Sequence, residues 1–154
     1  MSPSIGAIEA GAGRAAATSA SGPALATYVG TQFERVCLQW LVRQNRQGKL
    51  PFLATAFGRW WGTDPRAREE VDIDVMATAK ATSSALFGEC KWRGSFDETE
   101  ALRKLEQRAS LPGDFRERHY VLFSREPVSQ KTHRKAAGCD DVRLIDVERL
   151  YDGL

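Results

Sequence analysis

Residues 71–77 read VDIDVMA and residues 85–92 read ALFGECKW, and these two stretches decide the fold. The first alternates apolar and polar side chains at a period of two, which predicts a strand with Val71, Ile73, Val75 and Ala77 on one face. The second is rich in aromatic and small apolar residues and predicts another strand. Because only a short turn over residues 80–84 separates the two, we expect them to form a hairpin.

Further elements are predicted on both sides of this hairpin. Apolar residues at helical spacing indicate a helix over about residues 28–45, and a strand is expected over residues 52–62. After the hairpin, a helix begins at Ser95 or Asp97 and ends near Ala109. The remaining predictions are a strand at 119–123, a helix at 128–137, a short strand at 142–145 and a terminal helix from Asp146. The order α-β-β-β-α-β-α-β-α predicts an α/β fold with a mixed central sheet flanked by helices.

Length and composition limit the classes of protein that fit. The 154 residues carry 22 Lys and Arg against 20 Asp and Glu, so the net charge is only +2. Residues 1–26 are mostly Ala, Gly, Ser and Thr, which predicts a disordered tail or linker and leaves residues 27–154 for one domain. No apolar run reaches the roughly 20 residues that cross a bilayer, and the tail lacks the basic start of a signal peptide. We therefore expect a cytoplasmic protein without a membrane partner.

Acidic side chains stand at unusual positions on the two central strands. Asp72 and Asp74 share one face of the first strand, and Glu89 and Lys91 share one face of the second. One register of the hairpin brings both pairs together. Like charges at close range are costly without a cation, and oxygen ligands favour Mg²⁺ or Mn²⁺ over zinc. Taken singly, each pair also fits a solvent-facing edge strand or an exposed ion pair.

The first helix supplies another carboxylate. Idealised helix geometry places Glu34 inside the apolar arc, between Leu38 and Leu41. A carboxylate in this position needs a partner, and either a metal ion or a basic side chain at the sheet edge would serve. Glu34 alone also fits a helix-edge residue, but three acidic elements that can converge are harder to explain by chance.

These residues together resemble a known superfamily. Glu34 on a first helix, Asp74 on a strand and the run Gly88–Trp92 on the next strand resemble the PD-(D/E)XK, or restriction-endonuclease-like, nucleases. Residues 28–34 (YVGTQFE), 58–62 (GRWWG), 71–77 and 86–92 (LFGECKW) are most similar to the nuclease-like domain found C-terminal to archaeal-type P-loop ATPases. The resemblance covers about residues 27–123 and implies an αβββαβ core.

The resemblance also implies roles for individual residues. Asp74, Glu89 and Glu34 would be metal ligands for Mg²⁺ or Mn²⁺, with Asp72 as the alternative to Asp74, and Lys91 would be the basic catalytic partner. The implied activity is metal-dependent hydrolysis of phosphodiester bonds in nucleic acid, with DNA the favoured substrate. Candidate nucleic-acid contacts are Trp60, Trp61, Trp92, Lys131 and Arg134. Packing in the core or at its rim is the competing interpretation of the tryptophans.

The chain also departs from the pattern of that family. It contains no Gly-x-x-x-x-Gly-Lys-Ser/Thr loop, so we expect a stand-alone remnant or a truncated reading frame, with any P-loop ATPase as a separate partner. The alternative function is a catalytically silent nuclease-fold module that interacts with or regulates such an ATPase. A structural DNA-binding domain is a third interpretation, and a homodimer is left open.

Overall fold

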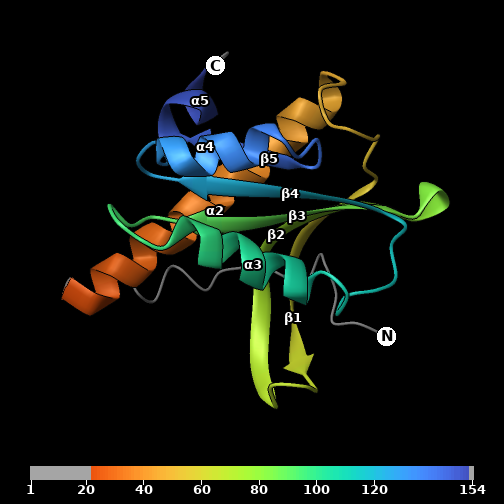
Figure 1. The fold of residues 1–154 in the computed structure, drawn as a ribbon, viewed down its shortest axis with the longest axis horizontal. Helices are drawn as coiled ribbons and strands as arrows, with labels where there is room; N and C mark the ends of the chain where they lie inside the picture. Colours follow the sequence, from red (N-terminus) through yellow and green to blue (C-terminus); the bar gives the residue numbers. More distant parts are fainter. Residues whose placement is uncertain (1–21, 153–154) are drawn as a thin grey trace.

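The computed structural model describes residues 22–152, and its elements follow the predicted order (Figure 1). They are α2 (Gly22–Arg46), β1 (Ala56–Asp64), β2 (Glu69–Ala79), the 3₁₀ turn η1 (Lys80–Thr82), β3 (Ser84–Lys91), α3 (Glu98–Arg108), β4 (Glu117–Ser124), α4 (Gln130–Ala137), β5 (Val142–Asp146) and α5 (Val147–Tyr151). Of the two candidates for the start of α3, the structure selects Asp97, whose side chain accepts a hydrogen bond from the Glu100 N–H at 3.0 Å.

The strands form one mixed sheet in the order β1-β2-β3-β4-β5. β1, β2 and β3 are antiparallel neighbours, which short turns can connect, whereas β3, β4 and β5 are parallel. Parallel neighbours need a crossover, and α3 and α4 provide the two crossovers. The predicted α/β fold, a mixed sheet flanked by helices, is confirmed.

Helices cover both faces of the sheet (Figure 1). We call the first apolar layer the α2-side core; Cys37 and Leu41 of α2 pack there with Leu86 of the sheet and Leu150 of α5. On the opposite face, the α3-side core packs Leu105 of α3 against the sheet, and a smaller cluster extends this layer beneath α4. Within residues 22–152, no helix has both the length and the apolar character that crossing a membrane requires.

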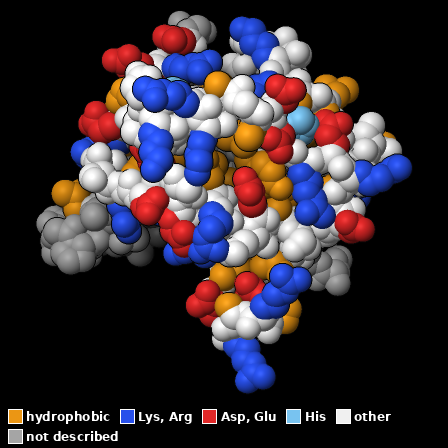
Figure 2. Space-filling model, in the orientation of Figure 1, with side chains coloured by type: hydrophobic (Ala, Val, Ile, Leu, Met, Phe, Trp, Pro, Cys, Tyr) orange, Lys and Arg blue, Asp and Glu red, His pale blue; other side chains and the backbone are white. Residues whose placement is uncertain are grey.

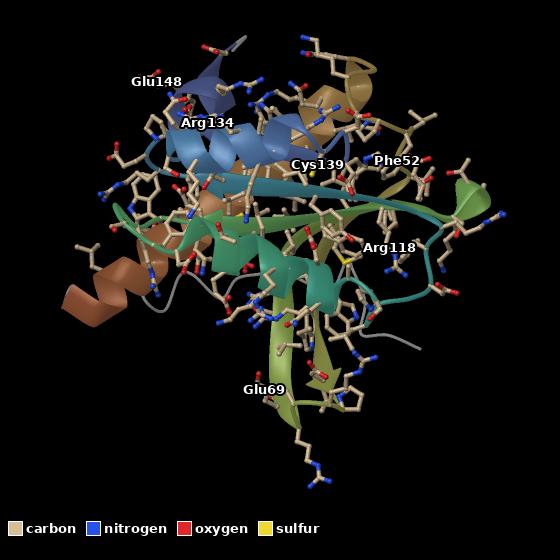
Figure 3. All side chains as sticks on the ribbon, viewed as in Figure 1. Phe52, Glu69, Arg118, Arg134, Cys139 and Glu148 are labelled. Carbon is tan, nitrogen blue, oxygen red and sulfur yellow. The ribbon has the colours of Figure 1, made fainter. Side chains whose placement is uncertain are left out.

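The two central strands separate before they end. The β2–β3 ladder stops at the pair Val75↔Gly88; beyond it, β2 continues only with β1, and β3 continues only with β4. Figure 1 shows the β1–β2 hairpin extending away from the rest of the sheet, and Glu69 marks its far end in Figure 3. We call the position where the strands part, at Asp74 on β2 and Glu89–Lys91 on β3, the strand fork.

A β-bulge next to the fork corrects the predicted alternation of β2. The β1–β2 register shifts between Gly58↔Met76 and Trp60↔Ile73, so that two residues of β2 lie opposite Arg59. As a result, Ile73 packs in the α3-side core while Val75 packs in the α2-side core. The expectation that these two side chains share one face is wrong, because the bulge reverses the pleat between them.

Two predicted boundaries also change. α2 begins at Gly22, so residues 22–26 of the expected tail are helical; the rest of that tail, residues 1–21, lies outside the described residues. Alanine-rich sequence with Pro in the first turn can start a helix without an apolar stripe. β1 starts at Ala56 rather than residue 52, because the Asn45 side chain pairs with both the N–H and the C=O of Ala54 and holds that segment against the end of α2.

Candidate metal centre

Asp74 is the central carboxylate of the strand fork. Its Oδ2 accepts a hydrogen bond of 2.8 Å from the backbone N–H of Cys90, where the β2–β3 ladder has already ended. Burial raises the pKa of Asp74 well above its usual range, and the negative charges of Glu89 and Glu34 raise it further, whereas the Cys90 N–H lowers it. Asp74 is therefore a partly buried acid held by the backbone and surrounded by other acids.

Glu34 approaches the same place from α2. Its side chain is 27% exposed, and its Oε1 lies 3.9 Å from Nη1 of Arg59. Burial raises the pKa of Glu34 to about 7; Arg59 acts in the opposite direction, and the charges of Asp72 and Glu89 add to the rise. The apolar arc of the helix thus forces Glu34 toward the sheet, where a basic side chain meets it.

Arg59 is a component of the site that the sequence does not assign. Its guanidinium forms a salt bridge and hydrogen bond with Asp72, and it also faces Glu34. Its Nε is buried without a hydrogen-bond partner in the described part of the chain. Burial lowers the pKa of Arg59, but the hydrogen bond and charge of Asp72 outweigh this effect and raise it overall. The only signal in the sequence was the need of Glu34 for a basic partner; the bulge opposite Arg59 determines which residue fills that role.

Glu89 and Lys91 lie on the β3 side of the fork. Nζ of Lys91 is 3.4 Å from Oε1 of Glu89, and the two side chains are 27% and 13% exposed, respectively. The position of β3 is fixed by close packing, because a Cβ added at Gly88 would lie 2.4 Å from Cγ2 of Val75 and 3.1 Å from Cγ1 of Val121. Gly88 therefore allows β2 and β4 to approach β3 just before the candidate residues.

The structure brings four of the predicted site residues, Glu34, Asp74, Glu89 and Lys91, to one fork. Asp72 is also nearby, but its carboxylate is engaged by Arg59, which favours Asp74 over Asp72 as the central ligand. As the side chains lie, no three His, Cys, Asp or Glu residues among positions 22–152 are arranged to hold one metal ion. Neighbouring carboxylates raise the pKa of Glu34 and of Asp74, but the oxygens of these described side chains do not converge on a single position that could hold an ion.

The predicted nucleic-acid contacts divide into separate groups. Trp60 is 4% exposed and packs in the α3-side core, so its ring is not available for stacking on a base. Trp61 and Trp92 are 41% and 38% exposed; Trp92 lies against Phe33, with its ring centroid 5.0 Å away, and under the guanidinium of Arg125.

Lys131 and Arg134 are exposed on α4, which packs on β5 rather than at the fork; Figure 3 labels Arg134 there. Figure 2 shows Lys and Arg side chains interspersed with Asp and Glu on this face, so they form no continuous basic stripe on it. Lys131 also lines a surface pocket together with Gly94, which lies three residues beyond the end of β3.

Comparison with known proteins places this arrangement in context. The chain is 32% identical over 124 residues to the uncharacterized protein MJECL04 of Methanocaldococcus jannaschii; the match covers 79% of this chain and 25% of that protein. In three dimensions it is similar to the crystal structure of protein VC1899 from Vibrio cholerae, with a TM-score of 0.60 and 20% identity over 86% of this chain and 34% of the other. The chain therefore spans about a quarter to a third of the length of these relatives, and the structural likeness concerns the fold alone.

A family model also matches residues 1–105, a segment that includes α2, the first three strands and all four residues gathered at the fork. This match covers more than half of the chain, which therefore belongs to DUF234, a family described as archaea bacterial proteins of unknown function.

Proposed function

We propose that this chain is a metal-dependent nuclease that hydrolyses phosphodiester bonds of nucleic acid, with DNA as the favoured substrate. The observation that carries the proposal is the carboxylate of Asp74 at the strand fork. Burial and the negative charges of Glu89 and Glu34 disfavour its ionised form. A protein does not keep such a group in its ionised form without compensation, and a divalent cation is the compensation that also performs chemistry on phosphate.

The available donors fit Mg²⁺ or Mn²⁺. Asp74, Glu89 and Glu34 offer only carboxylate oxygens, which these cations prefer to nitrogen or sulfur. When bound, the cation would neutralise charge on the scissile phosphate and lower the pKa of a coordinated water. Because Arg59 faces Glu34, we expect Glu34 to turn from Arg59 toward Asp74 and Glu89 when it becomes a ligand.

Lys91 is the candidate for the basic catalytic residue of the reaction. It lies two residues beyond Glu89 on the same strand, with its ammonium 3.4 Å from the Glu89 carboxylate. An ammonium in this position can orient the attacking water or stabilise the charge that develops on the phosphoryl oxygens. Trp61 and Trp92 supply exposed aromatic rings that could stack on bases, and Lys131 and Arg134 could attract the backbone of a longer substrate.

A second candidate is a catalytically silent module of the same fold, of the restriction-endonuclease type, that acts with a separate P-loop ATPase. The observation in its favour is the pairing of Arg59 with both Asp72 and Glu34, which satisfies part of the acidic cluster without a metal. The matched segment is also only one part of longer relatives, as expected for a module.

The test is cleavage of DNA and RNA substrates by the purified chain with Mg²⁺, with Mn²⁺ and with EDTA. We expect metal-dependent cleavage that Asp74→Ala and Lys91→Ala each abolish. The matched controls are Asp140→Ala and Lys104→Ala, which remove exposed charges away from the fork. Cleavage that persists in both fork variants would overturn the site, and a folded, metal-binding wild type without cleavage would favour the silent module.

A further inference from the structure

A hollow of about 400 Å³ opens beside the edge strand β5, on the opposite side of the sheet from the β1–β2 hairpin. Its walls come from four separate elements: α2 supplies Trp40 and Gln44, α4 supplies His133, β5 supplies Arg143, and α5 supplies Arg149. We call this cavity the β5 hollow. Neither the candidate metal centre nor the proposed nuclease reaction makes use of it.

The hollow is basic, and none of the described residues that line it is acidic. Arg143 is partly buried and donates a hydrogen bond of 3.1 Å from Nη1 to the backbone oxygen of Lys49. Arg149 donates from Nη1 to the backbone oxygen of Leu144 at 3.5 Å. In the part of the chain that the structure describes, neither guanidinium forms an ion pair with a carboxylate.

The two guanidinium groups also act on each other. Burial lowers the pKa of Arg143, and the positive charge of Arg149 lowers it further. Asp146 is an acidic residue near the hollow, but its carboxylate accepts the backbone N–H of Arg149 at 3.1 Å and caps α5. Each guanidinium uses one nitrogen for a backbone carbonyl, which leaves further N–H groups of both side chains free to bind a ligand.

The N-terminus of α4 offers a comparison, because there a carboxylate of the chain itself occupies a site for an anion. At the N-terminus of α4, the carboxylate of Glu98 accepts hydrogen bonds from the N–H and the hydroxyl of Ser129 and from the hydroxyl of Thr132. The chain thus supplies its own anion at that position. At the β5 hollow the described residues supply two guanidinium groups and no anion, although the unpaired charge of Arg143 is partly buried, which is unfavourable.

We infer that the β5 hollow binds a phosphoryl group, which Arg143 and Arg149 hold from two sides. Guanidinium groups match the oxygens of phosphate in geometry and form strong charge-assisted hydrogen bonds with them. Gln44 and His133 add polar groups to the wall, and the volume exceeds that of one phosphate, so a nucleoside can be accommodated as well. Free nucleotides and the backbone of a nucleic acid both carry this chemistry.

The experiment measures binding calorimetrically with the full chain, in EDTA and at low salt, so that it does not depend on the metal centre. The probes are inorganic phosphate, adenosine monophosphate and an oligonucleotide without terminal phosphates. We expect the wild type to bind phosphate, and Arg143→Gln and Arg149→Gln each to weaken binding by at least about tenfold. Arg143→Lys keeps the charge but loses the planar guanidinium group, so its affinity for phosphate should lie between those of the glutamine variants and the wild type.

Two controls separate this inference from the proposed function. Arg35→Gln removes an exposed arginine of α2 that does not line the hollow and should bind phosphate like the wild type. Asp74→Ala should also bind phosphate normally, whether or not the chain is a nuclease. Arg149 is exposed, so its variant remains informative if Arg143→Gln fails to fold, which thermal unfolding will show.

The outcomes are distinct. Tighter binding of the monophosphate than of the oligonucleotide, lost in both arginine variants, identifies a nucleotide site; the reverse order identifies a contact to the nucleic-acid backbone. Absence of binding of all three probes to the folded wild type overturns the inference, and so does binding that Arg143→Gln and Arg149→Gln leave unchanged.

Discussion

The strand fork and the β5 hollow are regions of opposite charge on one sheet. At the fork, Asp74 and Glu34 are partly buried acids, and burial and neighbouring acids raise the pKa of each. At the hollow, burial and a neighbouring arginine lower the pKa of Arg143. In both regions the fold thus disfavours the charged form of a group that is ionised in water, because burial and like charges act in the same direction.

The difference lies in the counter-charge that the chain provides. Arg59 and Lys91 offset part of the negative charge at the fork, whereas within residues 22–152 the two arginines of the hollow bond to backbone carbonyls and form no ion pair. This difference is the basis of the proposals that the fork binds a small cation and that the hollow binds an anion. The edge strand β5 lies three strand spacings of about 4.8 Å each from β2 and two from β3, so each region can be changed without directly disturbing the other.

The largest effect is expected from Asp74→Asn. We predict a loss of nuclease activity of about a thousandfold or more, since the amide cannot act as an anionic metal ligand. Thermal stability should rise by a few degrees, because the amide oxygen can still accept the Cys90 N–H while a buried negative charge disappears. Activity assays test the predicted loss of cleavage and calorimetry tests the predicted gain in stability, with Asp140→Asn as the control for both. A variant that is both active and less stable would contradict the assignment.

The next largest effect is the pH dependence of the free energy of unfolding. The pKa of Glu34 is raised from 4.5 to about 7 in the folded chain, so the native state keeps a proton that the unfolded state has lost. The resulting stability is fully present below about pH 4.5 and is lost as pH rises through about 7, a difference of up to about 3 kcal/mol. Urea unfolding across this range should show the decline, and Mg²⁺ should restore stability mainly at the alkaline end.

Glu34→Gln should flatten this pH dependence, whereas Glu69→Gln, at an exposed position at the far end of the β1–β2 hairpin, should leave it unchanged. Asp74 acts in the same direction as Glu34, so some slope will remain in the first variant. Equal slopes for the wild type and Glu34→Gln would show that Glu34 is not a buried acid of the fork.

A smaller effect is expected from packing beside the fork. Gly88→Ala should destabilise the fold by about 1–3 kcal/mol, because the new methyl group would lie 2.4 Å from Cγ2 of Val75 and the strands must move apart. Gly30→Ala is the matched control: a Cβ there meets nothing within 4 Å, and alanine in a helix should stabilise by up to about 1 kcal/mol. Chemical denaturation of both variants tests this; a neutral Gly88→Ala would mean that β2 and β3 do not approach each other so closely.

The smallest effect is expected for the coupling between the two regions, which should be close to zero. Saturating Mg²⁺ and saturating phosphate should each increase the free energy of unfolding by about 2–4 kcal/mol and raise the unfolding temperature accordingly. The two increases should add. Asp74→Ala should remove only the response to Mg²⁺, and Arg149→Gln only the response to phosphate. A single variant that removes both responses would show that fork and hollow form one site.

Much of the fold could be predicted from local patterns. Period-two alternation, helical spacing and capping residues predicted the order of elements, the central hairpin and two candidate caps for α3, Ser95 and Asp97, of which the structure selects Asp97. These signals arise between residues close in the chain. The prediction that Glu34 must find a partner within the apolar face of its helix also needed no tertiary information. The identity of that partner, Arg59, could not be predicted in this way.

The sequence by itself thus determined the α/β class, the succession of strands and helices, and which acids could converge. Only the tertiary structure decided that a bulge breaks the alternation of β2, that Arg59 engages Asp72 and leaves Asp74 central, that Trp60 is buried, and that four distant elements enclose the β5 hollow. The physical reason is range: periodicity and capping are fixed by neighbours along the chain, whereas strand register, ion pairing and cavities depend on which distant segments meet.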